Sequence, residues 1–212
     1  MRTKKDGEFR SSVYTQRPPY ADFDAPQKFQ AIQSIIAKRL REHPNAMCSY
    51  SGGSDSDIML HMIETVRNIF GLPPIKYFFF ETGLEMEATR RHVKETAELY
   101  GVENPIPFRV SNHCCDICKK QPAHAIEKQF DMVITGERRD EGGMRSVPRS
   151  DSSTMCFTET AAGKFRLRPL YYVSDADKQW YKDFFGIRYS DAYEVYGLKR
   201  TGCCGCAISA RA

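Results

Sequence analysis

Apolar positions along the chain recur with two different periods, and the two alternate from one segment to the next. Over residues 27–42, and again over 56–70, apolar side chains return every three or four positions, which is the period of an amphipathic helix. Short runs rich in β-branched and aromatic residues lie between such stretches and are typical of strands. The pattern predicts helices at 27–42, 56–70, 86–100, 116–129 and 174–185, and strands at 46–50, 75–80, 106–110, 131–135 and 165–173.

Capping and breaking residues support several of these boundaries. Asp24 is suited to cap the first helix, Pro26 fits its first turn, and Pro44 ends it. Gly71 and Gly101 follow the last apolar positions of the next two helices, where a glycine commonly ends a helix. These ends are therefore predicted by two independent signals, the apolar period and the terminal residue types.

The alternation of helices and strands predicts an α/β fold, with a mostly parallel sheet and helices on both faces. Residues 75–80, IKYFFF, carry apolar side chains on both faces, as strands of a buried parallel sheet do. Ligands of such folds bind beyond the carboxyl ends of the strands. Residues 1–25 are polar and contain prolines, so we expect an irregular N-terminal arm before one domain at 26–212.

Composition and charge limit the class of protein and its cellular location. The 212 residues are 41% hydrophobic, which suits one globular domain, and the net charge of +4 is compatible with a phosphate-rich ligand or with nucleic acid. No apolar run approaches the roughly 18 residues of a membrane span. The charged start lacks the apolar stretch of a secretory signal. We therefore expect a cytoplasmic protein without a membrane partner, of undetermined oligomeric state.

The segment 51–56, Ser-Gly-Gly-Ser-Asp-Ser, lies between a predicted strand and a predicted helix. Two glycines let the backbone approach an anion closely, and the free N–H groups of the following helix face the loop. Asp55 is negative, so we expect it to brace the loop or to help hold a cation. No lysine follows the second glycine, which excludes a Walker-type loop. The predicted phosphate site consists of Ser51, Gly52, Gly53, Ser54, Asp55 and Ser56.

Arginines crowd the loop that follows the predicted strand at 131–135. A guanidinium binds phosphate or sulfate through two parallel hydrogen bonds. A basic loop can also be a solvated surface, but its place at the carboxyl end of a strand favours anion binding. The arginines concerned are Arg138, Arg139, Arg145 and Arg149.

Six of the eight cysteines fall into two tight clusters, Cys114–Cys118 and Cys203–Cys206. A reducing compartment disfavours structural disulfides, so clustered thiols there more often bind metal or carry out redox chemistry. Four thiolates from two loops could hold Zn²⁺ or a 4Fe–4S cluster, and spacing alone does not separate the two. Cys48 stands alone on a predicted strand, where we expect it to pack in the core.

These motifs, in this order, resemble those of the PAPS and APS reductases of the PP-loop superfamily. PAPS is 3′-phosphoadenosine 5′-phosphosulfate, and APS is adenosine 5′-phosphosulfate. SGGSDS at 51–56 resembles the PP-loop SGGxDS, and ETGLE at 81–85 resembles D/E-T-G-x-E. Residues 135–145 are similar to T-G-x-R-R-x-E-S-x-x-R. Residues 169–181 are similar to P-L-x-x-W-T-x-x-D-V-W-x-Y, with Val173 in place of the first Trp and the later Trp, Trp180, displaced by one position. The resemblance covers about residues 45–206. It implies an adenine-nucleotide α-hydrolase-like, Rossmann-like fold.

The resemblance also implies a ligand and a cofactor. An adenine nucleotide (APS, PAPS or ATP), with Mg²⁺ as a candidate companion ion, would bind at the loop. Its further contacts would be Glu81, Thr82, Gly83, Gly136, Arg138, Arg139 and Arg145. Iron–sulfur members hold a 4Fe–4S cluster with CC plus CxxC, which here gives Cys114, Cys115, Cys203 and Cys206. Cys118, Cys156 and Cys204 are alternative ligands or free thiols.

Two enzyme functions follow from the resemblance. The first is a sulfonucleotide reductase-like oxidoreductase of sulfur metabolism, with a thiol or sulfur-donor protein as candidate partner. The reductases use a cysteine in a tail of the type E-C-G-L-H; the sequence given ends at Ala212 without such a segment, so the catalytic residue is unassigned. The alternative is an ATP-pyrophosphatase-type sulfurtransferase that modifies DNA or tRNA. A non-catalytic nucleotide or redox sensor is a third hypothesis.

Overall fold

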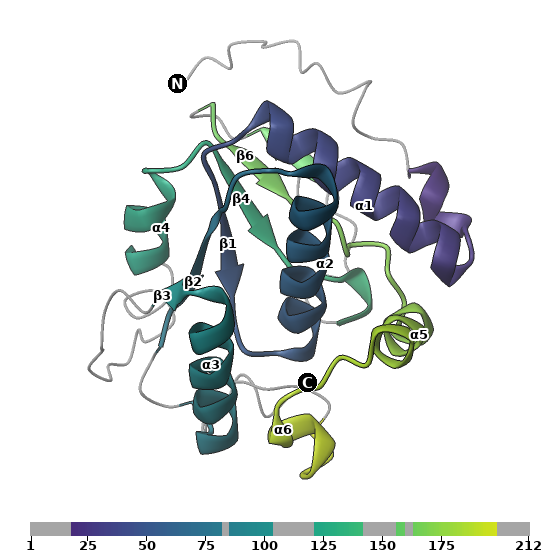
Figure 1. Cartoon of the computed structure of the whole chain (residues 1–212), viewed down its shortest axis with the longest axis vertical. Coiled ribbons are helices and arrows are strands. Elements are labelled where there is room, and N and C mark those ends of the chain that lie inside the picture. The colour runs from purple at the N-terminus through teal and green to yellow at the C-terminus, as the bar shows by residue number, and fades with distance from the viewer. Residues whose placement is uncertain (1–17, 82–84, 104–120, 142–155, 160–162, 199–212) are drawn as a thin grey trace, which may run out of the picture.

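The computed structural model describes residues 18–81, 85–103, 121–141, 156–159 and 163–198. These residues form a six-stranded sheet in the order β3-β2-β1-β4-β6-β5 (Figure 1). All neighbouring strands are parallel except β5 and β6, which are antiparallel. The predicted mostly parallel α/β sheet is therefore confirmed. The strands are β1 Ala46–Tyr50, β2 Lys76–Phe79, β3 Val102–Glu103, β4 Met132–Thr135, β5 Phe157–Glu159 and β6 Phe165–Leu167.

Helices connect the strands and follow the predicted boundaries closely. They are α1 Ala25–Glu42, α2 Ser54–Phe70, α3 Glu87–Tyr100, α4 Gln121–Glu127, α5 Asp175–Phe185 and α6 Asp191–Glu194, with 3-10 turns η1 Pro19–Asp22 and η3 Arg139–Glu141. Asp24 caps α1 by accepting a hydrogen bond from the Gln27 backbone N–H at 3.0 Å. Ser174 and Asp177 form a reciprocal capping box at α5. No helix in the described ranges combines the length and apolar character needed to cross a bilayer.

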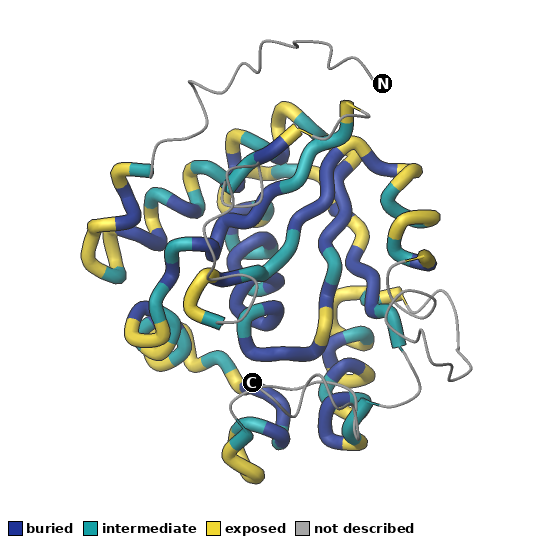
Figure 2. The backbone as a smooth tube through the Cα atoms, turned by 180° about the vertical axis from the view of Figure 1, so that it is seen from behind, coloured by how far each residue is buried: buried dark blue, intermediate teal, exposed yellow. Residues whose placement is uncertain are grey.

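The core lies on both faces of the sheet, because neighbouring residues of one strand point to opposite sides. Cys48 of β1 belongs to the larger buried cluster, which also contains Ile32 of α1 and Ile63 of α2. Met47, one residue earlier, belongs to a smaller cluster against which Ile126 of α4 packs. Most residues of the central strands β1 and β4 are accordingly buried (Figure 2). Helices therefore cover both faces, as predicted.

The structure departs from the predicted elements in several places; among them, α6 was not predicted, and α4 ends at Glu127 instead of at residue 129. The strand predicted at 165–173 ends at Leu167, because Pro169 has no N–H to give a ladder and the chain turns, with Tyr171 N–H bonding Arg168 O at 3.2 Å. The two-residue β3 and three-residue β5 were not predicted. Within the predicted irregular arm, η1 forms a turn that buries Tyr20. The strand predicted at 106–110 lies outside the described residues.

Candidate functional site

The 51–56 loop follows β1 at the point where the strand order reverses. β1 pairs with β2 on one side and with β4 on the other, and Ser49 lies opposite Thr135 at the end of β4. The chain passes from β1 through α2 to β2 on one side, and it later returns from β3 through α4 to β4 on the other side of β1. Open α/β sheets bind ligands at such a switch point, beyond the carboxyl ends of the strands. The fold thus places the predicted phosphate loop where a ligand is expected.

Serine hydroxyls hold the loop in its shape. Ser56 Oγ accepts a hydrogen bond from Gly53 N at 3.0 Å and donates one to Gly53 O at 2.7 Å. Ser51 Oγ donates a hydrogen bond to Ser56 Oγ at 3.1 Å. The first helical hydrogen bond joins Asp57 N to Gly53 O at 3.0 Å, so the N–H groups of Ser54 to Ser56 precede the helical ladder. The loop therefore presents backbone donors and the positive end of α2.

Glycines 52 and 136 permit the close packing of this region. Gly52 has φ +67°, and a Cβ there would lie 2.6 Å from Val93 Cγ2 on α3. A Cβ on Gly136 would lie 3.0 Å from the backbone oxygen of Asp55. Because neither position leaves space for a methyl group, the loop touches α3 on one side and the segment after β4 on the other.

Asp55 connects the start of α2 to two basic side chains. Its Oδ1 accepts from Arg138 Nε at 2.9 Å and lies 2.9 Å from Lys178 Nζ of α5. Arg138 also donates to Val173 O at 3.1 Å and to Asp175 Oδ1 at 2.7 Å, and it is only 3% exposed. Burial lowers the pKa of Arg138, but the two carboxylates raise it by more, so the guanidinium stays charged. The protein itself thus uses Arg138 to hold three segments together.

Lys178 of α5 is a second basic residue that contacts the first turn of α2. Its Nζ donates to Ser54 Oγ at 2.7 Å in addition to pairing with Asp55. Its side chain keeps 17% of its surface exposed, against 4% for Arg138. Sequence reasoning missed Lys178, because it is 124 positions from Ser54 and its own segment carries no anion-binding signal.

A second set of polar residues braces α2 against α3. Asp57 Oδ1 accepts from Tyr50 OH at 2.6 Å and from His92 Nε2 at 2.9 Å. Burial lowers the pKa of His92, but the hydrogen bond and charge of Asp57 outweigh burial and leave this pKa raised. The sequence motif does not extend to Asp57 or His92, so only the structure identifies this contact.

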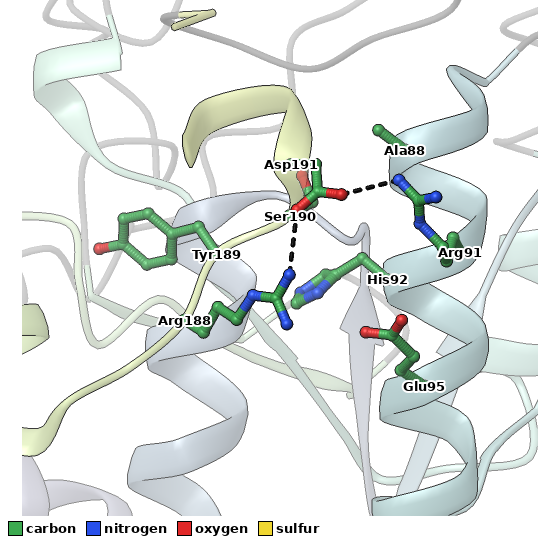
Figure 3. Close-up of a pocket in the computed structure, with 8 residues that line it drawn as sticks. All are labelled: Ala88, Arg91, His92, Glu95, Arg188, Tyr189, Ser190 and Asp191. Atoms are coloured by element: carbon green, nitrogen blue, oxygen red, sulfur yellow. Dashed lines mark hydrogen bonds and ion pairs between the residues drawn. The ribbon is translucent and has the colours of Figure 1, made fainter. Parts of the chain in front are cut away.

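A small polar pocket lies behind His92, between α3 and the segment that leads into α6 (Figure 3). There Asp191 accepts hydrogen bonds from Arg91 at 2.7 Å and from Arg188 at 3.1 Å. The pocket volume is about 10 Å³, which suits about one water molecule. The contacts of Asp191 therefore join α6 to α3, and the pocket between them is too small for a nucleotide.

The remaining predicted contacts are divided between described and undescribed residues. Glu81 pairs with Arg90 at 2.9 Å, and the Arg139 N–H donates to Tyr171 O while its side chain is half exposed. Gly136 lies against Asp55, as given above. The other predicted residues, which lie outside the described residues, are Thr82, Gly83, Arg145, Arg149, Cys114, Cys115, Cys118, Cys203, Cys204 and Cys206.

The two described cysteines occupy protected positions. Cys48 is fully buried in the core, as predicted, and burial raises its pKa to about 12. Cys156 Sγ lies 2.7 Å from the Tyr20 hydroxyl, and burial raises the pKa of this thiol to about 11. Both thiols are thus protonated near neutral pH. Within the described ranges, no group of three or more His, Cys, Asp or Glu side chains could hold a metal ion.

The parallel sheet, with a glycine loop at its switch point, defines an α/β protein of the PP-loop, Rossmann-like class. The chain belongs to the phosphoadenosine phosphosulfate reductase domain family, whose model matches residues 45–208. The predicted family resemblance is therefore confirmed.

Known proteins share this architecture at low sequence identity. The adenosine 5′-phosphosulfate reductase of Chelativorans sp. (strain BNC1) is 23% identical over 195 residues, which are 84% of this chain and 74% of that protein. The phosphate complex of Candida auris PAPS reductase matches with a TM-score of 0.63 and 17% identity, over 82% of this chain and 89% of that one. A U34-tRNA thiolase of Methanococcus maripaludis with its [4Fe-4S] cluster matches with a TM-score of 0.50 and 16% identity. The match covers 86% of this chain and 70% of that one.

Proposed function

We propose that this protein is an enzyme of sulfur metabolism that binds the anionic end of an adenine nucleotide at the 51–56 loop. The nucleotide is APS, PAPS or ATP. The observation that carries the proposal is the loop itself, with α2 N–H groups beyond the central strand of a parallel sheet. Family membership supports adenosine as the organic part of the ligand.

Within this site the residues have different tasks. Backbone N–H groups of Ser54 to Ser56 and the Ser54 hydroxyl receive the anion. Arg139 and Arg145 supply charge from the loop after β4, where the Arg139 side chain is half exposed and pairs with the neighbouring Asp140 only at 4.0 Å. Arg138 acts through Asp55, by fixing the start of α2. Glu81, Thr82, Gly83 and Gly136 line the nucleotide.

The cofactor part of the proposal is a 4Fe–4S cluster held by Cys114, Cys115, Cys203 and Cys206. Four thiolates are the usual ligand set of such a cluster. Cys48 is fully buried in the core, and Cys156 Sγ already lies 2.7 Å from the Tyr20 hydroxyl, which disfavours both thiols as ligands. The cluster would supply redox or sulfur chemistry beside the nucleotide. A reductase would take electrons from a thiol protein, and a sulfurtransferase would act on DNA or tRNA.

The test combines metal analysis with nucleotide titration. Protein purified without oxygen should contain about four iron and four sulfide per chain. It should bind at least one of ATP, APS and PAPS in isothermal titration. Ser54→Ala should weaken that binding by roughly 5- to 20-fold, because a hydrogen bond to a charged group is lost. Ser34→Ala on α1, whose hydroxyl donates to Gln30 O within the same helix, is the matched control.

Cysteine variants test the ligand set. Cys203→Ser should remove most of the iron, and Cys156→Ser should leave it unchanged. Iron lost from Cys156→Ser would overturn the ligand assignment. Colourless, metal-free wild-type protein without affinity for any adenylate would overturn the function.

A second candidate, an ATP-pyrophosphatase-type sulfurtransferase, is favoured by the two cations around Asp55, which suit a highly charged ligand. Its distinguishing readout is pyrophosphate release that requires ATP together with DNA or tRNA. Sulfite release from APS or PAPS with a thiol protein would indicate the reductase instead.

A further inference from the structure

We infer that Lys178 contacts the anionic end of the nucleotide and selects ligands that end in phosphate over ligands that end in sulfate. This inference rests on the proposed function, because it concerns the same loop. It assigns the site to the ATP class rather than to APS.

The first argument is the position of the ammonium group. Lys178 Nζ lies 2.7 Å from Ser54 Oγ and 2.9 Å from Asp55 Oδ1, at the first turn of α2. An ammonium has three N–H donors, and these contacts use two of them. No acceptor for the third is found in the described part of the chain, and the side chain is 17% exposed. A group bound to the Ser54 hydroxyl would therefore lie beside a free N–H of Lys178.

The second argument is that the positive charges at this end of α2 are only partly shielded by carboxylates. Arg138 and Lys178 share a single oxygen of Asp55. Arg138 has a second carboxylate partner, Asp175, but Lys178 does not share it, and its side chain is 78% exposed, so water and salt screen it. Lys178 therefore has half of one buried carboxylate as its counter-charge, next to the positive end of α2. A bound anion would add to this counter-charge.

The surroundings of Lys178 strengthen its attraction for a negatively charged ligand. Its Nζ lies 5.7 Å from the ring centre of Tyr189, a residue that is 6% exposed. The Tyr189 hydroxyl is buried and has no hydrogen-bond partner among the described residues. Because the ring keeps water away on that side, the effective dielectric constant is lowered and a charge on the ligand is felt more strongly.

The third argument is the chemical difference between the ligands. A terminal phosphate carries about two negative charges near neutral pH, whereas a sulfate ester carries one. Coulomb attraction grows with the product of the charges, so Lys178 stabilises a terminal phosphate more than a sulfate. The compact ammonium acts as a point charge and suits this task.

The experiment compares ATP and APS binding to the wild type, Lys178→Met and Lys178→Arg by isothermal titration. We expect Lys178→Met to lose roughly 10- to 100-fold in ATP affinity, as for a lost charged hydrogen bond. Its APS affinity should fall by only roughly 3- to 10-fold, because half the charge product halves the lost free energy. Lys178→Arg keeps the charge and should retain ATP affinity within about fivefold.

Lys182→Met is the matched control, since Lys182 lies one turn later on α5 and pairs with Glu194 at 2.8 Å. It should leave both affinities unchanged. Asp55 keeps Arg138 in the Lys178 variants, so they should fold, which circular dichroism verifies. If the wild type binds neither nucleotide, the proposed function fails and the inference with it. If the wild type binds, and Lys178→Met loses nothing or loses ATP and APS affinity equally, the inference alone is wrong.

Discussion

Arg138 shows how one buried side chain can hold a site in shape without contacting the ligand itself. Its contacts with Asp55, Val173 O and Asp175 join the start of α2, the loop after β4 and the start of α5. We expect Arg138→Met to lower the free energy of unfolding by about 2–3 kcal/mol, because a carbonyl and a carboxylate lose a charged partner. Urea denaturation measures this change.

The neighbouring arginine provides the comparison for this variant. Arg139→Met removes the same charge from a side chain that is 51% exposed, so the free energy of unfolding should change by less than about 0.5 kcal/mol. Equal losses for the two variants would mean that the contacts of Arg138 do not stabilise the fold.

Residues that are close in sequence could be predicted as site residues, and residues that meet only in space could not. The strand, Gly52-Gly53 and the start of the helix lie within one segment, so their pattern predicted the loop. Lys178 comes from 124 positions away, and nothing near it in sequence indicates an anion. The same holds for His92, 35 positions from Asp57. Tertiary contacts of this kind require the arrangement of the helices to be known.

At the scale of elements, prediction succeeded where the sequence carries several signals for one boundary. α1 has an apolar period, a capping Asp24 and an early proline, and it forms as predicted. β3 and β5, of two and three residues, are too short for a period to be visible. The strand predicted to reach Val173 was too long, because apolar residues around Pro169 pack in the core from a turn.

The contact between α2 and α3 should depend on pH through His92. Asp57 raises the pKa of His92 above its ordinary value of 6.5, while Glu95 adds to this effect and Arg188 opposes it. A raised folded-state pKa means that the stabilisation is complete below the unfolded value and is lost as pH rises through the folded value. The free energy of unfolding should therefore fall, relative to His92→Gln, as pH rises above 6.5.

Urea denaturation at several pH values from about 5.5 to 9 measures this difference, across the range in which histidine titrates. A wild-type advantage over His92→Gln that grows with pH would contradict the assignment of the Asp57 contact.

At the scale of the whole molecule, the sheet supports the site without forming its surface. Ile134 is fully buried on β4, which pairs with both β1 and β6 and leads into the segment of Gly136 and Arg138. Ile134→Ala should reduce the free energy of unfolding by about 2–4 kcal/mol, through lost apolar contacts and a residual cavity. The loop itself is fixed by its own hydroxyls and by Asp55, so nucleotide affinity should change little.

Ligand binding and core packing should then contribute to stability independently. A nucleotide at about 100 times its Kd adds about 2.7 kcal/mol to the free energy of unfolding, because it binds the folded state only. Wild type and Ile134→Ala should gain the same increment in urea denaturation with and without the bound nucleotide, since distant effects add. A smaller increment in Ile134→Ala would mean that the cavity displaces β4 far enough to reach Gly136. In that case the backbone contact between Gly136 and Asp55, and not the loop hydroxyls, would set the shape of the site.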